Sequence, residues 1–434
     1  MLFTTLVVSL GLLQASALTV PTRSHGVREV AVAAAAAIPT LTLLSDFQKD
    51  NVTASWAPGH PKVWGQAEKK FSIPTPPLPA GVDAVFTEDG KFLLLTNVTD
   101  TDVIRLDTGA VVSTLKLKFP SYGTHTSVSA APGGEYDFLV AASNFTWDDK
   151  VTQQRLSQDG VPVGPSVDRP GFFSNGGFDP TVVDGDGKRV LLAIDIDDVH
   201  VYDLDDVNSS VVTLTGHTDS IQSIVFSPDK KTIASTGFDG HVKLWDAATG
   251  TLVHDIPPED PEQAPDYQNW LTRFSPDGKT LLYSIGSPLP EVKLVQLNNL
   301  TDVVTLGPFS YWVRSAEWNS DGSLLALGGF PWLLVLRSSD LAVVQEWRVD
   351  TEHWEEVLFL HWFDKDTKLR WSYLNGTEMY DFEKNLKYRW GPDEDDVPPP
   401  GWVVLAGDWF PFKSEGWFGN FDSDSSVRVW SLPE

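Results

Sequence analysis

Three residues between Leu214 and Gly250 have the side chains that serine hydrolases use in catalysis: His217, Ser235 and Asp239. In such an enzyme the histidine takes the proton of the serine hydroxyl, and the carboxylate holds the histidine in the required tautomer. The serine must also be exposed on a sharp turn beside an oxyanion hole. No Gly-x-Ser-x-Gly turn occurs in the sequence, so we interpret the three residues as hydrogen-bonding partners within the fold.

The segments that must position these residues are short and apolar, and they alternate with Gly, Pro, Asp and Asn from about residue 80 to the end of the chain. Apolar residues make up 41% of the 434 residues, which is enough to bury a large core. No window of helix length keeps a period of 3.6 residues. The pattern therefore predicts an all-β protein.

One short motif recurs along the chain. It combines an aromatic residue, a tight turn of the Pro-Asp-Gly type and an apolar strand, as in "FSPDKKTIAS" from Phe226, "FSPDGKTLLYS" from Phe274 and "WNSDGSLLALG" from Trp318. With the weaker copies there are eight such segments, spaced about 45 residues apart. This period predicts a single β-propeller of about eight four-stranded blades. Seven blades is the alternative, if one weak segment is an insertion.

Residues 214–246 resemble a WD40 repeat, with Gly216-His217 at one end and Trp245-Asp246 at the other. Residues 402–432 contain a second, fair match, since "FDSDSSVRVWSL" aligns with "FDGHVKLWDA"; the other segments keep only the turn and the period. The resemblance implies that an N-terminal strand completes the last blade. We expect the stretch "KVWGQAEKKFSIP" from Lys62 to supply it.

The resemblance also gives the three residues of the opening motif a structural role. In WD40 repeats a His, a Ser, an Asp and a Trp form a hydrogen-bonded tetrad within one blade, and these correspond here to His217, Ser235, Asp239 and Trp245. Such a tetrad satisfies buried polar groups and ties strands together.

The N-terminus indicates export from the cell. Residues 1–17 contain an apolar run followed by Ala15-Ser16-Ala17, as in a secretory signal peptide. We predict a partly disordered leader or pro-segment over 18–60 and the propeller over 61–434. Six Asn-x-Ser/Thr sequons support a secreted, extracellular glycoprotein. They are Asn51, Asn97, Asn144, Asn208, Asn299 and Asn375.

Composition excludes several kinds of partner and site. The formal net charge of −27 repels phosphate backbones and anionic lipid, so we expect no nucleic-acid binding. We also expect no membrane span, because the second apolar stretch, from Val30, is short and broken by Pro39. The absence of cysteine excludes thiol nucleophiles and cysteine-ligated metal sites. No cofactor is predicted, although a metal in the central channel is left open.

Aromatic residues are the strongest candidates for ligand binding. The chain has 17 Trp, and several precede the first strand of a predicted blade or lie between its second and third strands. These connections share one face of a propeller, and rigid Trp and Tyr beside Arg are typical of binding hot spots. We predict a binding surface made of Trp270, Tyr311, Trp312, Arg314 and Trp332.

We therefore expect a secreted, non-catalytic binding or scaffold module for a protein, peptide or glycan. One alternative is an extracellular enzyme, similar to a lactonase, lyase or hydrolase, with its site at the mouth of the central channel. The polar candidates for that site are His125, Asp179, Asp219, Arg314, His353 and Glu356. The other alternative is a lectin that uses the same Trp residues.

Overall fold

The computed structural model divides the chain into two units, Met1–Ile38 and Pro39–Glu434, and all described residues belong to the second. The described residues are 55–60, 62–63, 67, 69–72, 83–97, 99–117, 123–143, 150–170, 183, 188–194, 198–206, 208, 211–259, 267–330, 332–348, 357, 359–363, 365–373, 376–391, 417–422 and 426–431. The predicted signal peptide lies outside them, as does the leader up to residue 54.

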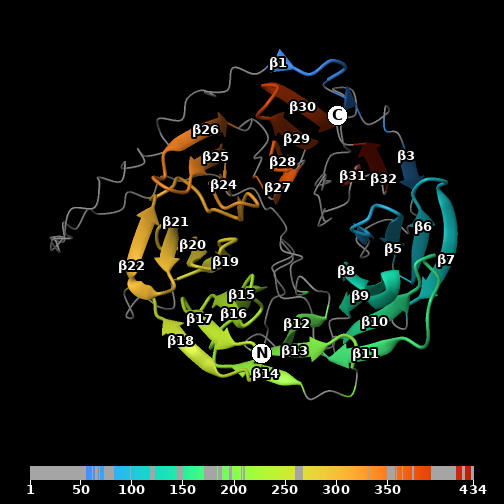
Figure 1. Cartoon of the computed structure of the whole chain (residues 1–434), viewed down its shortest axis with the longest axis horizontal. Helices are drawn as coiled ribbons and strands as arrows, with labels where there is room; N and C mark the ends of the chain where they lie inside the picture. Colours follow the sequence, from blue (N-terminus) through green and yellow to red (C-terminus); the bar gives the residue numbers. More distant parts are fainter. Residues whose placement is uncertain are drawn as a thin grey trace, which may run out of the picture. The chain divides into compact units, whose positions relative to one another are not determined.

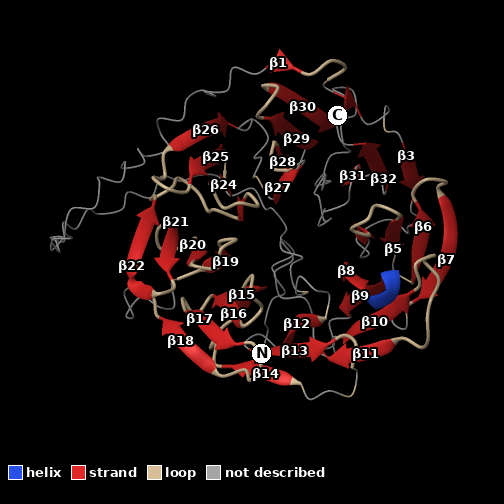
Figure 2. Cartoon of the chain, in the orientation of Figure 1, coloured by secondary structure: helices blue, strands red, loops and turns tan. Residues whose placement is uncertain are grey.

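Nearly all regular structure in this part of the chain is β-strand (Figure 2). The strands form eight separate sheets. Five sheets have four strands each. The first is β4 (Asp83–Phe86), β5 (Phe92–Thr96), β6 (Asp100–Arg105) and β7 (Ala110–Lys116), and the second is β8 (Gly123–Ala131), β9 (Glu135–Ser143), β10 (Lys150–Leu156) and β11 (Val167–Pro170). The other three are β15 (Ile221–Phe226), β16 (Thr232–Gly237), β17 (Val242–Asp246) and β18 (Leu252–Ile256); β19 (Asn269–Phe274), β20 (Thr280–Ile285), β21 (Glu291–Gln296) and β22 (Asn299–Leu306); and β23 (Ser315–Trp318), β24 (Leu324–Gly328), β25 (Trp332–Arg337) and β26 (Val343–Arg348).

The other three sheets differ in strand number. One has three strands, β12 (Arg189–Ile194), β13 (Asp198–Asp203) and β14 (Val212–Thr215). Another joins β3 (Lys69–Ser72) to β31 (Trp417–Asp422) and β32 (Ser426–Ser431). The sheet of β27 (Phe359–Phe363), β28 (Lys368–Tyr373), β29 (Gly376–Asp381) and β30 (Leu386–Gly391) gains two short strands, β1 (Ser55–Trp56) and β2 (Lys62–Val63).

The sheets follow one another around a ring, with strands such as β15 and β19 on the inside and β18 and β22 on the outside (Figure 1). The apolar core is divided among the interfaces between neighbouring sheets. Leu282 and Leu334, for example, lie in one cluster that joins the second strand of one sheet to the third strand of the next. A larger cluster joins Phe86, Trp390 and Trp430 from three sheets, where the two ends of the ring meet. The prediction of an all-β propeller is confirmed.

The predicted closure by an N-terminal strand is also found. Strand β3 pairs antiparallel with β32, placing Lys69 opposite Val429 and Ser72 opposite Ser426. The strand lies inside the stretch from Lys62 that was expected to close the ring. The structure adds an unexpected feature, because β1 lies within the predicted leader and pairs with β30.

The recurrent turn between the first and second strands is held by its own side chains. Ser227 Oγ donates to Asp229 Oδ1 (2.7 Å) and accepts a hydrogen bond from Thr232 N (3.0 Å). Ser275 and Asp277 repeat this arrangement, and their hydrogen bond is also 2.7 Å long. These contacts fix the chain reversal, which explains why the Ser-Pro-Asp pattern recurs at both of these turns.

The WD40-like tetrad forms inside the β15–β18 sheet. Asp239 Oδ2 accepts from His217 Nδ1 (2.9 Å), His217 Nε2 accepts from Ser235 Oγ (2.7 Å), and Ser235 Oγ accepts from Trp245 Nε1 (2.9 Å). The direction follows because a carboxylate only accepts and an indole only donates. Ser235 is 1% exposed and His217 is 4% exposed. A substrate has no access to this serine, so the tetrad has a structural role.

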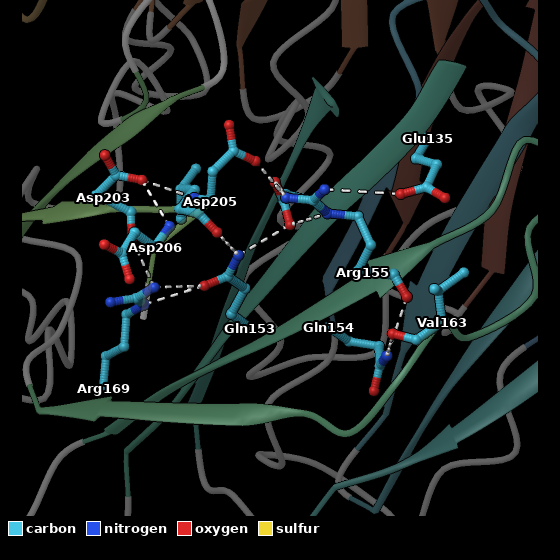
Figure 3. Close-up of polar contacts among 11 residues, drawn as sticks. Glu135, Gln153, Gln154, Arg155, Val163, Arg169, Asp203, Asp205 and Asp206 are labelled. Carbon is cyan, nitrogen blue, oxygen red and sulfur yellow. Dashed lines mark hydrogen bonds and ion pairs between the residues drawn. The ribbon is translucent and has the colours of Figure 1, made fainter. Parts of the chain in front are cut away.

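A second polar network joins the β8–β11 sheet to the β12–β14 sheet (Figure 3). The fully buried Asp137 accepts hydrogen bonds from Gln153 Nε2 and Arg155 Nε, each 2.9 Å long. Arg155 Nη2 reaches across to Asp205 Oδ1 (2.8 Å), and Gln153 Oε1 accepts from Arg169 Nη2 (2.8 Å). Every charge in the network thus has an opposite or neutral polar partner, as buried charges require.

We predict that Lys230→Gly stabilises the protein by about 1 kcal/mol, because the left-handed backbone region costs a residue with a Cβ about that much. Lys230 has a φ of 62°, whereas Gly278 occupies the corresponding position of the next turn at 68°. Gly278→Ala, whose new Cβ would make only ordinary contacts with Pro228, should destabilise by a similar amount. Denaturation midpoints of both variants test this, and a lower midpoint for Lys230→Gly would contradict it.

We further predict that Asp239→Asn lowers the free energy of unfolding by about 2 kcal/mol near neutral pH, because a charge-assisted buried hydrogen bond is lost. Burial raises the pKa of Asp239, but the hydrogen bond and charge of His217 and the backbone N–H groups of His241 and Thr218 outweigh it, and the net pKa is lowered.

The stabilisation from Asp239 is therefore complete above the ordinary carboxyl pKa of about 4 and is lost as the pH falls through the lowered value. The difference between wild type and Asp239→Asn should shrink in acid. Denaturant titrations from neutral pH to about pH 3 measure it, with the exposed Asp302→Asn as the control. A difference that is constant with pH would contradict the linkage.

Candidate functional site

Six residues from three consecutive sheets form one cluster of aromatic rings around an arginine. They are Phe238, Trp270, Tyr311, Trp312, Arg314 and Phe330, and we call them the aromatic patch. All six side chains are half-buried. They come from the connection after β16, the start of β19, the connection before β23 and the connection after β24, in the sheets β15–β18, β19–β22 and β23–β26 (Figure 1).

The rings of the patch form a chain of contacts that runs from one sheet to the next. Trp270 stacks on Trp312 with 5.2 Å between ring centroids, and Trp312 stacks on Tyr311 at 5.3 Å. Phe238 meets Trp270 edge-on at 4.8 Å, and Phe330 meets Tyr311 edge-on at 5.4 Å. These geometries are favourable for aromatic pairs. The five rings therefore form a continuous, ordered array.

Trp270 is aimed into this array by a β-bulge. Asn269 pairs with Ile285 and Leu271 pairs with Ser284, so Trp270 is the extra residue of β19. A bulge of this kind turns a side chain out of the regular alternation of the strand. Gln222 occupies the same bulged position in β15, between Ile221 and Ser223.

Arg314 supplies the positive charge of the patch. Its guanidinium carbon lies 4.0 Å from the ring centroid of Trp270 and 5.4 Å from that of Trp312. A cation over an indole at these distances is attracted by the ring electrons, more strongly where water is partly excluded. The arginine therefore contacts both Trp side chains.

Gly286 provides the space for the array. A Cβ atom at this position would lie 2.4 Å from Trp270 Nε1 and 3.1 Å from Trp312 Cδ1. The first distance is shorter than real Cβ contacts show, and the second is tighter than most, so a side chain here would displace Trp270. The residue that follows β20 must therefore be small for the patch to form.

The structure corrects one predicted member of the binding surface. Trp332 is 1% exposed and stacks on Phe309 at 4.8 Å inside the core between sheets. It is the first residue of β25, and a Cβ on Gly329 would touch its ring at 2.6 Å. The side chain thus points into the sheet interface, so the prediction that Trp332 binds ligand is wrong. The half-buried loop residue Phe330 joins the patch instead.

The channel-mouth candidates are only partly described. Asp179, His353 and Glu356 lie outside the described residues. His125 lies on β8 opposite Ala141, and its side chain is not described. Asp219 is exposed in the turn before β15, where its Oδ1 accepts from Ser220 N (2.7 Å).

Arg314, the remaining candidate, belongs to the aromatic patch. Across the described ranges, no group of three or more His, Asp or Glu side chains is placed to hold a metal ion. Within the same ranges, no helix is long and apolar enough to cross a membrane.

Three of the six sequons are described, of which two lie in turns or connections and the third begins a strand. Asn97 follows β5, Asn208 lies between β13 and β14, and Asn299 begins β22. The Oδ1 atom of Asn97 accepts from Thr99 N (2.8 Å), and that of Asn299 accepts from Thr301 Oγ1 (2.8 Å). Asn51, Asn144 and Asn375 lie outside the described residues.

Known proteins resemble the chain over limited stretches. The WD domain, G-beta repeat matches residues 208–246. An uncharacterized WD repeat-containing protein of Synechocystis is 29% identical over 136 residues, which cover 31% of this chain and 35% of that protein. The small ribosomal subunit protein RACK1 of Caenorhabditis elegans is 26% identical over 166 residues, or 36% of this chain and 45% of that protein. The chain thus aligns with less than half the length of either relative.

The fold has a broader match. The crystal structure of Saccharomyces cerevisiae Sqt1 superimposes with a TM-score of 0.63, covering 85% of this chain and 99% of that one at 12% sequence identity. An identity this low shows the fold alone. The matched repeat, the WD-repeat relatives and the ring of sheets together support the resemblance of this chain to WD40-repeat β-propellers.

Proposed function

We propose that this protein is a secreted, glycosylated binding module without catalytic activity of its own, and that a protein partner binds at the aromatic patch. WD40 propellers commonly serve as protein-interaction scaffolds. The observation that carries the proposal is the half-buried array of five rings and one arginine across three sheets. Trp, Tyr and Arg held in place before binding lose little conformational freedom on contact, which is why they dominate interface hot spots.

The occupied ring faces favour a protein or peptide over a glycan. A sugar needs the free face of a ring, and here Trp312 already stacks on Trp270 and Tyr311. Trp270 in turn carries Arg314 over its ring. The patch therefore offers ring edges, and the connection after β20 adds the exposed Leu289. Such a surface suits side chains of another protein.

The surroundings of the patch favour a basic partner. Asp219 is exposed beside Phe238, whose N–H bonds to Ser220 O (2.9 Å). With a net charge of −27 on the whole chain, positively charged proteins would be steered toward it.

The placement of the sequons supports the secretion and glycosylation parts of the proposal. Asn208 and Asn299 are exposed, as an oligosaccharide acceptor must be. Asn208 lies in the connection that leads into β14, and Asn299 is the first residue of β22, each of which is the last strand of its sheet. The aromatic patch is built from other connections, so glycans at these two positions would leave it open.

We predict that Trp312→Ala weakens partner binding by about 2 kcal/mol, or roughly thirtyfold, because it removes the ring at the centre of the array. Partners are captured from the medium of the source organism with the full-length chain, and each one's affinity is then measured for wild type and variant. Val253→Ala is the matched control, since Val253 is 53% exposed on the outer strand β18. Equal affinity of wild type and Trp312→Ala for every partner would refute the proposed site.

The basic nature of the partner gives a separate test. Affinity should fall as ionic strength rises from about 0.05 M to 0.5 M, because salt screens the attraction between the acidic chain and a basic partner. Asp219→Asn should reduce this salt dependence. Affinity that does not change with salt would show that charge does not select the partner, and would leave the aromatic contact standing.

A further inference from the structure

Each sheet of the ring has an outermost strand, and these strands differ in how their outer edge is protected (Figure 1). An unpaired edge offers its backbone groups to any extended chain, and proteins protect such edges with charged residues, proline or a covering segment. The edge of β30 is covered by β1 and β2. The outermost strands β3, β7, β11, β18 and β26 contain basic residues or proline, namely Lys69, Lys116, Arg169, Pro170, His254 and Arg348.

Strands β14 and β22 are the two outermost strands in the described part of the chain that have none of these protections. Strand β14 reads Val-Thr-Leu-Thr over Val212–Thr215. Strand β22 pairs in unbroken register with β21 only over 303–306, which reads Val-Val-Thr-Leu, and its one charged residue, Asp302, precedes this part. Val303 is 40% exposed, and β-branched residues favour strand pairing. Both edges can therefore accept another strand.

A sequon lies at the same distance before each of these two stretches. Asn208 precedes Val212 by four residues, and Asn299 precedes Val303 by four residues. Both asparagines are exposed. Four residues of extended chain span at most about 14 Å, so a bulky oligosaccharide on either asparagine reaches the edge beside it. The third described sequon, Asn97, lies between β5 and β6 and does not precede an outermost strand.

We propose that glycans on Asn208 and Asn299 are edge guards, which keep β14 and β22 from pairing with the same edges of a second copy of this chain. This inference rests on the glycosylation in the proposed function. Asn208 and Asn299 flank the two edges that the sequence leaves without basic residues or proline, whereas the edges that have such residues need no glycan.

A second copy of the chain fits these edges because its own edges are identical and uncharged over the paired stretch. When two β22 strands pair antiparallel about Val304, Val303 lies opposite Thr305 of the second copy, and Asp302 lies opposite Leu306. The two Asp302 side chains therefore do not oppose each other, and like charges in direct opposition are what destabilise such a pair. Two identical edges related by a twofold axis give a closed dimer.

The test uses the full-length chain secreted by a eukaryotic host. Glycopeptide mass spectrometry first establishes that Asn208 and Asn299 are modified. Sedimentation equilibrium then gives the mass of the particle in about 0.15 M salt, where repulsion between acidic chains is largely screened. Wild type should be a monomer. Asn208→Gln and Asn299→Gln should each dimerise, with a dissociation constant at least about tenfold below that of wild type.

Two variants make the test specific to the strand edges. Asn97→Gln removes a sequon that guards no outermost strand, so this variant should stay monomeric. Val303→Lys, added to Asn299→Gln, should restore the monomer, because a lysine in the middle of an edge opposes strand pairing. Restoration by this one change also shows that the dimer is not a product of misfolding.

Each way in which the proposal can fail has its own readout. A monomeric Asn208→Gln or Asn299→Gln variant, when wild type is modified at that position, would overturn it. So would equal association of Asn97→Gln, or a dimer that persists after Val303→Lys. Unmodified Asn208 and Asn299 in wild type would refute both the edge guards and the glycosylation in the proposed function. Partner binding at the aromatic patch is measured separately, through Trp312→Ala, and does not depend on these results.

Discussion

Every sheet in this ring must be covered on both faces, and only neighbouring sheets can cover them. The core is accordingly divided into clusters that each join adjacent sheets, for example Leu244 with Leu281 and Ala326 with Leu369. Such an arrangement leaves two uncovered faces unless the ring closes. Closure depends on the pairing of β3 with β32, which completes the last sheet and brings Phe86, Trp390 and Trp430 into one cluster.

The aromatic patch and the tetrad depend on this packing in different ways. The tetrad is internal to one sheet, where it satisfies polar atoms that the neighbours have sealed from water. Its hydrogen bonds are those of a hydrolase triad, yet Ser235 is inaccessible and also accepts from Trp245. Burial therefore decides its role, whereas the geometry alone does not. The patch lies where connections of three sheets converge, so the ring sets the spacing of its members.

The sequence predicts the features that repeat and fails at those that do not. The turn at Phe226, Phe274 and Trp318 recurs with a fixed period, which is enough for the fold, and the tetrad follows from one well-preserved repeat. The prediction for Trp332 fails because nothing in its neighbours indicates which way the first residue of a strand points. Phe238 is missed although a signal exists. It lies as many residues after Phe226 as Phe330 lies after Trp318, and Phe226 and Trp318 are the aromatic residues that begin the recurrent motif. Strands β1 and β2 have no local pattern at all, because two-residue strands carry no periodicity.

The pairing of β3 with β32 also has a consequence for how the chain is made. Strand β3 is synthesised before β4, whereas its partner β32 follows the strands of the other seven sheets in the chain. A nascent chain therefore holds one strand without a partner while sheet after sheet assembles behind it. Contacts between such distant segments form slowly, and unpaired edges are exposed to other chains meanwhile. For this protein the vulnerable period lasts from the synthesis of β3 to that of β32.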